Sequence, residues 1–484
     1  MRRSIEFWLV GAACLLFLAL AGYQIESPGL QADEVYFSSG IYEPDNIIYQ
    51  ARVFRRTVPL MLMSYLGCLK SWLYIPIFKV WTPSAASVRW PMLVAGAATI
   101  AVLALLLGSL AGSRAAVAVS VLLASDPSFL WTTRCDWGPT ALQHLLSAGG
   151  VYALHRSRLA GAGVLFGLAL WNKTTFAWFL PWLVILFFPR PLKPRSVATF
   201  LVAFLLGAYP WVRYNVSSEG ETARYTAHFT PKELGQRTVP LLLAIEGGSL
   251  IGYMMREGPV GHPWPLRRNA NLAVLGLALL ATIALRSRLV LQWLGLWVAS
   301  WVLMASTANG GESVHHIVLL WPWLYGWAAL ALAGASHRVR FGKWLLGGLL
   351  AVALCANILV VTHMHSALTT YGSDPHWSDA IYPLAQRIRR EPPPIVYAHD
   401  WGIAAPLRVL TTGRIRFEET QDHRLEDIAG QPALFITHTD RFEAFAGANQ
   451  RLRSIVGFTP RLLYTVSDSK GVEVFQVFRM EPSR

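Results

Sequence analysis

Leu60–Trp81 reads LMLMSYLGCLKSWLYIPIFKVW, and the placement of this stretch decides how the rest of the chain is arranged. The stretch is apolar and about as long as the roughly 20 residues that cross a bilayer as a helix. It also carries Lys70, Lys79, an internal Pro76 and several aromatic side chains, which are typical of a helix lying along a membrane surface. We therefore predict that this stretch lies on the outer membrane surface and does not span.

The composition indicates a membrane protein with many spans. Of the 484 residues, 54% are hydrophobic and 14% are charged, whereas roughly a quarter of the residues of soluble proteins are charged. Long apolar runs lie at residues 7–24, 60–81, 91–112, 115–133, 138–154, 159–171, 174–188, 197–212, 271–285, 289–305, 317–334 and 343–362. The first run contains Ala19-Leu20-Ala21, which is similar to a signal-peptide cleavage site, but the many later spans favour a retained first helix.

Positive charge indicates which runs cross the membrane. Short basic segments lie at residues 2–3, 114, 155–158, 190–195, 286–288 and 337–343. Such segments favour the cytoplasmic side, and all of them fall there only if residues 60–81 do not span. We therefore predict about eleven spans with a cytoplasmic N-terminus. The net charge of +14 follows largely from this loop bias, so we expect no nucleic-acid partner.

The composition changes after residue 362, which divides the chain into a transmembrane domain (1–362) and a small soluble α/β domain (363–484) on the outer side. Expected strands are 395–398, 433–436, 461–465 and 472–478, and expected helices lie near 403–412 and 441–449. The alternation predicts a sheet of three or four strands with helices.

In this topology, polar residues from the outer ends of different spans come to one side. They are Asp33, Glu34, Lys70, Arg134, Asp136, Lys173, His315 and His316. A carboxylate can take a proton from a nucleophile, and a Lys or Arg can neutralise charge that builds on a leaving phosphate. The set therefore indicates transfer chemistry on a phosphate-bearing substrate at a membrane surface.

The carboxylates and lysines also have structural interpretations. Asp33 is placed to cap a short helix over residues 34–40, and Asp136 to cap the fourth span, which has proline in its first turn. Lys70 and Lys173 fit interfacial lysines that extend their ammonium groups to water.

The remaining candidates have structural alternatives as well. Arg134 fits an ion pair with Asp136. The His315-His316 pair fits an interface pair better than a metal site, which would need further ligands. Cys68 and Cys135 fall on the outer side, which leaves a disulfide between them open, and no cysteine spacing indicates a metal.

The candidate residues also lie in an ordered set of motifs. The matching segments are Asp33-Glu34-x-Tyr36, Lys70-Ser71-Trp72-Leu73-Tyr74, Arg89-Trp90-Pro91, Ser125-Asp126-Pro127 followed by Asp136, Gly167-Leu168-Ala169-Leu170-Trp171-Asn172-Lys173 and His315-His316-Ile317-Val318-Leu319-Leu320-Trp321-Pro322. In order and spacing, over roughly residues 7–362, they resemble glycosyltransferases of the C superfamily (GT-C). The similarity is to the protein mannosyltransferase and aminoarabinose transferase group, glycosyltransferase family 39 and its relatives.

The resemblance implies a GT-C membrane domain with interfacial helices in the first outer loop. It implies a polyprenyl-phosphate-linked sugar as donor and transfer with inversion on the periplasmic face of a bacterial inner membrane. The acceptor is a protein, a lipid or a glycan. No metal ligand set stands out, and dependence on a divalent metal is left open.

The resemblance also implies roles for the candidates. Asp33 orients or deprotonates the acceptor, Glu34 supports it, and Asp136 is the second acid. Lys70, Arg134 and Lys173 bind the donor phosphate. Further site candidates are Tyr36, Arg89, His315 and His316.

Two other classes of protein compete with a transferase. A transporter or flippase of lipid-linked or anionic substrates also has many spans, but it usually places polar residues near mid-membrane, often in repeated halves. A non-catalytic scaffold that presents the C-terminal domain leaves the Asp33-Glu34 pair unexplained beyond capping.

Overall fold

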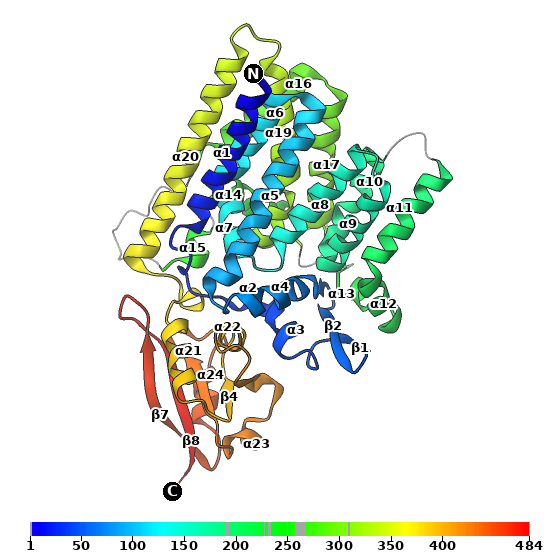
Figure 1. Cartoon of the computed structure of the whole chain (residues 1–484). Coiled ribbons are helices and arrows are strands. Elements are labelled where there is room, and N and C mark those ends of the chain that lie inside the picture. Colours follow the sequence, from blue (N-terminus) through cyan, green and yellow to red (C-terminus); the bar gives the residue numbers. More distant parts are fainter. Residues whose placement is uncertain are drawn as a thin grey trace.

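The computed structural model describes residues 2–188, 193–226, 228–230, 234–248, 250–256, 268–307 and 310–483. A bundle of helices stands on a small C-terminal sheet (Figure 1). The longer helices are α1 (Arg2–Gly22), α5 (Ala85–Ala111), α6 (Ser113–Ser125), α7 (Pro127–Arg134), α8 (Thr140–His155), α9 (Leu159–Asn172), α10 (Leu180–Phe187), α11 (Pro194–Gly207), α12 (Tyr209–Ser217), α14 (Leu234–Ile245), α16 (Asn271–Leu285), α17 (Arg288–Ala305), α19 (Trp321–Ser336) and α20 (Gly342–Tyr371). We call the end of the bundle that faces the C-terminal sheet the domain end.

Short helices complete the helical part. They are α2 (Ala32–Val35), α3 (Ser39–Tyr42), α4 (Leu69–Val80), α13 (Glu221–Thr226), α15 (Ile251–Met254) and α18 (Val314–Ile317), with 3₁₀ turns η1 (Tyr36–Ser38), η2 (Thr174–Trp178) and η4 (Val318–Leu320). Residues 190–192 of the predicted basic segment 190–195 lie outside the described part of the chain.

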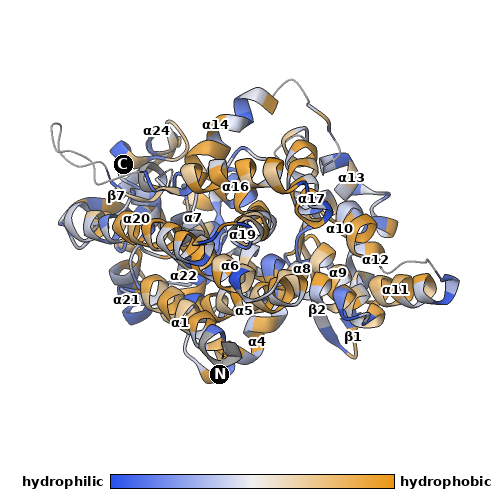
Figure 2. Cartoon of the chain, turned by 90° about the horizontal axis from the view of Figure 1, so that it is seen from above, coloured by the Kyte–Doolittle hydropathy of each residue, from blue (hydrophilic) through white to orange (hydrophobic). Residues whose placement is uncertain are grey.

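Several helices are apolar enough and long enough to cross a membrane. Within the described ranges these are α5, α17, the continuous stretch Val314–Ser336 and α20. Two further spans result if each of two bent pairs counts as one, namely α6 with α7, bent by 62°, and α11 with α12, bent by 70°. Shorter apolar helices accompany them, and Figure 2 shows hydrophobic residues across the width of the bundle. The predicted number of eleven spans stays a prediction.

Residues 60–81 do not form one helix, which corrects our expectation of a single interfacial helix there. The first part lies in β2 (Arg56–Met63), which pairs antiparallel with β1 (Tyr49–Val53) and with β3 (Leu66–Gly67). The β1–β2 turn has positive φ at two successive residues, Phe54 and Arg55, and such turns match the twist of a two-stranded hairpin. Only α4 is helical, and its 12 residues extend about 18 Å, too short to cross about 30 Å of hydrocarbon.

A buried carboxylate marks the bend between α6 and α7. Asp126 caps α7 by accepting a hydrogen bond from the backbone N–H of Phe129, at 2.7 Å. Its carboxylate also accepts hydrogen bonds from Trp321 (2.7 Å), Tyr325 (2.6 Å) and Asn271 (2.9 Å). Because these donors come from α19 and α16, the start of α7 is tied to two other helices. The direction of α7 sets the position of the residues that follow it.

The C-terminal sheet confirms the expected α/β pattern and adds a strand. Its elements are η5 (Pro375–Trp377), α21 (Ile381–Arg390), β4 (Ile395–Ala398), α22 (Ala404–Leu410), β5 (Arg416–Glu419), η6 (Thr420–Asp422), α23 (Leu425–Ala429), β6 (Leu434–His438), η7 (Asp440–Phe442), α24 (Ala448–Arg453), β7 (Phe458–Ser467) and β8 (Glu473–Pro482). The strand order is β5-β4-β6-β8-β7, so the sheet has five strands rather than three or four. β4 pairs parallel with β5 and β6, whereas β8 pairs antiparallel with β6 and β7.

The sheet and the domain end share one hydrophobic core. Buried residues of the loop after α1, of α4 and α5, and of α21, α22 and β4 belong to the same cluster. Arg408 of α22 forms an ion pair with Glu43 at 2.8 Å and donates a hydrogen bond to Ser39 at 3.2 Å. The C-terminal sheet is therefore packed against the part of the chain that holds most of the predicted site.

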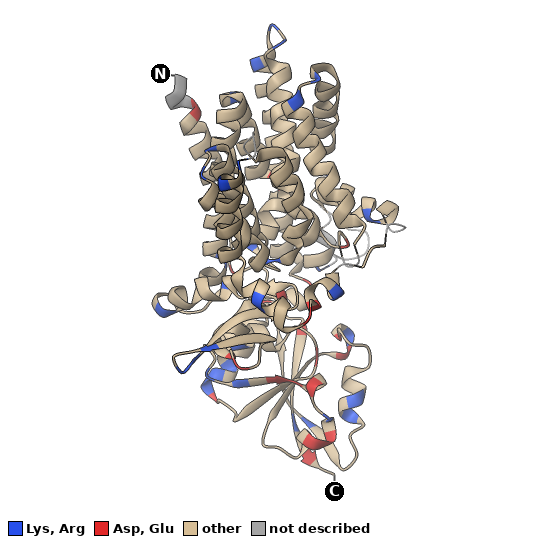
Figure 3. Ribbon diagram, turned by 90° about the vertical axis from the view of Figure 1, so that its right-hand side faces the viewer, with Lys and Arg blue, Asp and Glu red and all other residues tan. Residues whose placement is uncertain are grey.

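At the end of the bundle opposite the domain end, the charged residues are mostly Lys and Arg, whereas the C-terminal part carries residues of both signs (Figure 3). The positive-inside rule predicts this distribution for a cytoplasmic end. On that ground, we continue to predict that the C-terminal sheet lies on the outer side of the membrane.

Candidate active site

A small cavity of about 80 Å³ lies at the domain end, where the loop after α1 meets the ends of several helices. Its lining residues are Asp33, Tyr36, Met63, Tyr65, Leu66, Trp137, Gly138, Lys173, His315 and His316. Five of the ten candidate residues are among them: Asp33, Tyr36, Lys173, His315 and His316. Segments far apart in the sequence thus come together here, as the predicted topology requires.

Asp33 does not cap the helix it begins, which corrects one structural interpretation. The cap of α2 is Gln31, whose side-chain oxygen accepts from the backbone N–H groups of Asp33 at 2.7 Å and Glu34 at 3.3 Å. The Asp33 carboxylate is left to face the cavity. Burial raises the pKa of Asp33 above its ordinary value, while a hydrogen bond with Gln31 and the charge of Lys173 oppose the shift.

Lys173 directly follows α9 and supplies the cation of the cavity. Its side chain is only 1% exposed, and within the described ranges it has no hydrogen bond or ion pair. A Cβ atom at Gly138 would come within 2.9 Å of the Lys173 Nζ atom, so the absence of a side chain at Gly138 makes room for the ammonium group. Burial lowers the pKa of Lys173 to about 8, although the charges of Asp136 and Asp33 favour its protonated form.

Glu34 points away from the cavity and pairs with Arg89. The Arg89 guanidinium donates to both carboxylate oxygens of Glu34, at 2.7 and 2.9 Å, and both side chains are fully buried. Arg89 also donates to the carbonyl oxygens of Ile25, Pro28 and Gly29. The pair therefore fixes the loop that carries Asp33.

Lys70 pairs with Asp136 beneath the cavity. Its ammonium group donates to the Asp136 carboxylate at 2.8 Å, to the Asp136 carbonyl at 3.0 Å and to the Glu34 carbonyl at 3.2 Å. These contacts match the three N–H donors of a lysine, and the other Asp136 oxygen accepts from the Ala141 backbone N–H at 2.8 Å. Lys70 is thus a buried ion-pair partner of Asp136 and does not extend to water. Its three N–H groups are all used in these contacts and do not serve a phosphate.

Arg134 lies outside the cavity and does not pair with Asp136, which corrects the predicted ion pair. Its guanidinium donates to the carbonyl oxygens of Ala21 at 2.9 Å and Tyr23 at 2.6 Å, and to those of Gln24 and Ser27. A helix leaves its last carbonyl groups without partners inside the helix. Arg134 therefore binds the end of α1 and the loop that follows it.

The sequence analysis missed several lining residues and one supporting residue. Tyr65 comes from the β2–β3 turn, and Trp137 and Gly138 precede α8; the Trp137-Gly138-Pro139 turn was the available signal for that segment. Trp377 of η5 packs on Trp137 with ring centres 5.2 Å apart, and Tyr253 contacts both rings at 6.0 Å. No local sequence pattern connects Trp377 with this wall.

The two neighbouring histidines form the opposite side of the cavity. Their ring centres are 4.3 Å apart, and Ser313 Oγ lies 3.0 Å from Nδ1 of His315. In the part of the chain that the structure describes, no three His, Cys, Asp or Glu side chains are grouped in a way that could hold a metal ion. All four cysteines, including Cys68 and Cys135, are free thiols.

Comparison with known proteins identifies the fold. No protein-family model matches the chain, and no curated protein matches it. Among solved structures, the crystal structure of ArnT from Cupriavidus metallidurans bound to undecaprenyl phosphate matches 99% of this chain and 98% of its own, with a TM-score of 0.59 at 12% identity. The oligosaccharyltransferase of Archaeoglobus fulgidus in complex with Zn and sulfate matches 98% of this chain and 75% of its own, with a TM-score of 0.50 at 12% identity. The chain therefore has the GT-C fold that the sequence motifs implied.

Proposed function

We propose that the protein is an integral membrane glycosyltransferase that moves a sugar from a polyprenyl-phosphate donor to an acceptor, with inversion at the anomeric carbon. The observation that carries this proposal is that one carboxylate, Asp33, shares a cavity with one ammonium group, Lys173, that has no ion pair or hydrogen bond among the described residues. The fold supports it, because a structure with this fold was solved with undecaprenyl phosphate bound.

Lys173 is the proposed phosphate-binding residue. Its ammonium group is buried and has no partner among the described residues, so a donor phosphate would be its first counter-ion. In a site shielded from water, one such charge strongly stabilises negative charge on a leaving phosphate. Tyr36, His315 and His316 line the same cavity and are proposed to hydrogen-bond the phosphate or the sugar.

Asp33 is the proposed base. An acceptor hydroxyl attacks the anomeric carbon while the bond from that carbon to the phosphate oxygen breaks on the opposite face, which inverts the configuration. The hydroxyl proton passes to the Asp33 carboxylate, and the polyprenyl phosphate leaves as an anion beside Lys173. The raised pKa of Asp33 makes its carboxylate a better proton acceptor than an ordinary aspartate.

The other charged candidates have a structural role in this proposal. We call Glu34, Lys70, Arg89, Arg134 and Asp136 the frame of the cavity. Lys70–Asp136 and Glu34–Arg89 are closed ion pairs, and Arg134 is occupied by carbonyl groups. We therefore retain the phosphate-binding role for Lys173 and withdraw it from Lys70 and Arg134. Asp136 acts through its charge on Lys173 rather than as a second base.

The cavity has to widen for a substrate. Ligand sites commonly enclose about 300–1,000 Å³, far more than the cavity around Asp33. Two of its walls are a strand turn, with Tyr65 and Leu66, and the short helix α18, with His315. We propose that the donor enters by displacing one of these short segments, while the frame under the cavity stays in place.

The proposed setting is the outer face of a bacterial inner membrane. The basic end of the bundle then lies in the cytoplasm together with the N-terminus, and the C-terminal sheet lies in the periplasm. The acceptor is a protein, a lipid or a glycan that reaches Asp33 from the side of the C-terminal sheet.

Binding and transfer can be tested separately. Purified protein in lipid nanodiscs should bind undecaprenyl phosphate, and Lys173→Met should weaken that binding about tenfold or more, as loss of a charge-assisted contact does. The matched control is Lys79→Met, which removes an exposed lysine from the domain end. Unchanged binding by the Lys173 variant would remove its phosphate role.

Asp33→Asn should retain undecaprenyl phosphate binding and accumulate normally, yet fail to consume a panel of polyprenyl-phosphate sugars incubated with membranes. The matched control is Asp45→Asn, which alters an aspartate of the same outer loop that hydrogen-bonds Thr57. Full consumption of the donor by the Asp33 variant would contradict the assignment of Asp33 as the base.

A further inference from the structure

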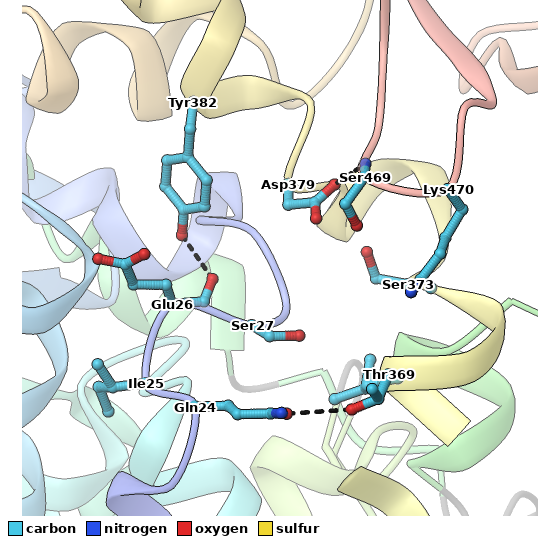
Figure 4. A pocket seen from close by; sticks show the side chains of 12 residues that line it. Gln24, Ile25, Glu26, Ser27, Thr369, Ser373, Asp379, Tyr382, Ser469 and Lys470 are labelled. Carbon is cyan, nitrogen blue, oxygen red and sulfur yellow. Dashed lines mark hydrogen bonds between the residues drawn. The ribbon is translucent and has the colours of Figure 1, made fainter. Parts of the chain in front are cut away.

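Two further cavities lie near α1 and α20, away from the cavity around Asp33. The first, of about 520 Å³, lies between the two helices and is lined by Leu20, Tyr23 and His365, among others. The second, of about 540 Å³, lies where the helices leave the bundle at the domain end (Figure 4). Both are lined by Gln24 and Thr369, so they adjoin, and neither shares a lining residue with the cavity around Asp33.

The first cavity is a groove on the outside of the bundle. The helices are joined there by few contacts: His365 Nε2 lies 3.1 Å from the Leu20 carbonyl, and the Tyr23 and His365 rings are 5.1 Å apart. Tyr23 is 57% exposed although it lies in an apolar stretch. Thr362, Ser366, Thr369 and Thr370 also line this groove, which lies where the predicted spans 7–24 and 343–362 reach their outer ends, so the chain of a lipid would enter it at the edge of the hydrocarbon layer.

The second cavity is lined mostly by polar residues and is built from four separate segments, one of which carries Asp379 and Tyr382 at the start of α21. Figure 4 shows Gln24 to Ser27 on one side, the end of α20 on another, and Ser469 and Lys470 of the β7–β8 turn above them. The segments are held together by hydrogen bonds from Tyr382 to the Glu26 carbonyl at 2.8 Å and from the Ser469 backbone N–H to Asp379 at 3.1 Å. A cavity with polar lining at this level is where a lipid head group would lie.

The charges of the second cavity indicate which head group fits. It is lined by one lysine, Lys470, and two carboxylates, Glu26 and Asp379. Within the described residues, neither the Lys470 ammonium nor the Glu26 carboxylate has an ion-pair or hydrogen-bond partner. A purely anionic head group would meet two carboxylates for one lysine. A head group with both signs would satisfy Lys470 with its phosphate and Glu26 with its cation.

We propose that these adjoining cavities are a binding site for a zwitterionic phospholipid whose head group carries one phosphate and one primary ammonium. The acyl chain lies along the α1–α20 groove, the phosphate contacts Lys470, and the ammonium contacts Glu26 and Asp379. This site is separate from the transfer site and does not rest on the proposed function.

The bound lipid would also strengthen the link between the bundle and the C-terminal sheet. Lys470 belongs to the sheet, whereas Glu26 belongs to the loop after α1. The carbonyl groups of Gln24 and Ser27 in that loop accept hydrogen bonds from Arg134. A head group held between Lys470 and Glu26 therefore orders a loop that is connected to α7.

The test uses the full-length protein in detergent after lipid removal, with dioleoyl phosphatidylethanolamine and dioleoyl phosphatidylglycerol as probes. Native mass spectrometry should show retention of the ethanolamine lipid about tenfold above the glycerol lipid. Glu26→Gln should remove that preference, Lys470→Met should weaken retention of both probes because both carry a phosphate, and Leu20→Trp should block retention by filling the groove.

Matched controls separate the site from the general lipid surface. Lys79→Met and Glu219→Gln change exposed charges elsewhere, and Leu359→Trp changes a lipid-facing residue of α20 that is 50% exposed. All three should retain the ethanolamine lipid as the natural chain does. Equal retention of the two probes, a preference for phosphatidylglycerol, an unchanged preference in Glu26→Gln, or undiminished retention of both probes in Lys470→Met would overturn the proposal.

Discussion

The Nζ atom of Lys70 lies 2.8 Å from Oδ2 of Asp136, and the two side chains are only 2% and 1% exposed. The pair connects α4 to the turn before α8, beneath the cavity that contains Asp33. Because the pair is buried, each charge is stabilised by its partner and not by water. The pair therefore has a structural consequence that can be measured apart from activity.

Lys70→Met should destabilise the protein by about 3–5 kcal/mol, because it leaves the Asp136 carboxylate buried without a counter-ion. The measurement is thermal unfolding of purified protein followed by tryptophan fluorescence. Lys79→Met, at the exposed end of the same helix, should leave the unfolding temperature unchanged, and adding Asp136→Asn to Lys70→Met should restore part of the loss. An unfolding temperature equal to that of the natural chain in Lys70→Met would contradict this account.

Gly138→Ala should weaken binding of undecaprenyl phosphate strongly, because the new Cβ atom would lie within 2.9 Å of the Lys173 Nζ atom. The backbone at Gly138 has φ +76°, so the substitution also adds strain. Gly220→Ala is the matched control, since Gly220 has φ +79° and no atom within 4 Å of the new Cβ. That control should cost about 1–2 kcal/mol of stability and leave the binding constant unchanged; equal effects of the two substitutions would show that strain alone is responsible.

The pH dependence of donor use should follow Lys173 on the alkaline side. The pKa of Lys173 is lowered to about 8, so its ammonium form, which attracts the phosphate, is lost as pH rises through about 8. We expect kcat/KM for the donor to fall there. Lys173→Arg should abolish that alkaline loss, because arginine stays charged. A fall near pH 8 that persists in the arginine variant would assign the titration to another group.

On the acid side, kcat/KM should follow Asp33. Burial raises the pKa of Asp33 above its ordinary value of 3.8, and only the ionised carboxylate can accept a proton. Activity should therefore be lost as pH falls through this raised pKa, at a higher pH than an exposed aspartate would give. Rate measurements across the acid range at donor concentrations well below KM locate this limb, and a limb at or below pH 3.8 would contradict the burial of the base.

The proposed orientation can be tested with single cysteines. In a variant without the natural cysteines, Ser469→Cys in the β7–β8 turn should react with a membrane-impermeant thiol reagent applied from outside. Ser157→Cys, in the turn after α8, should react only after the membrane is opened. Both serines are exposed, so a difference in labelling reports the side of the membrane and not burial. The opposite pattern would reverse the topology.

The sequence predicted that Asp33, Lys173, His315 and His316 meet, because loop charges alone place the ends of their helices on one side. It did not predict which of the charged residues are already paired. Arg134 is the last residue of α7, whereas Asp136 follows it in the turn before α8. Their side chains accordingly have separate partners, the end of α1 and Lys70.

Other features depended on contacts distant in sequence. The apolar character of residues 60–81 was visible, but strand β2 forms through pairing with β1 and β3. β5 has four residues and reads Arg-Phe-Glu-Glu, with Phe417 the one fully buried side chain. A strand so short and polar is recognised only when its partner β4 is known. Gln31 as the cap of α2 was equally hidden, because asparagine, aspartate, serine and threonine are the usual caps.

The packing of Trp377 on Trp137 has a consequence for how the protein unfolds. Trp377 follows the last long helix of the bundle, and the Gly29 backbone N–H donates to its carbonyl oxygen at 2.6 Å. Removing residues after 362 would therefore take away the support of the Trp137 wall of the cavity along with the sheet. Heating should melt bundle and sheet in one cooperative transition, and calorimetry of the intact chain should record a single peak where two independent domains would give two.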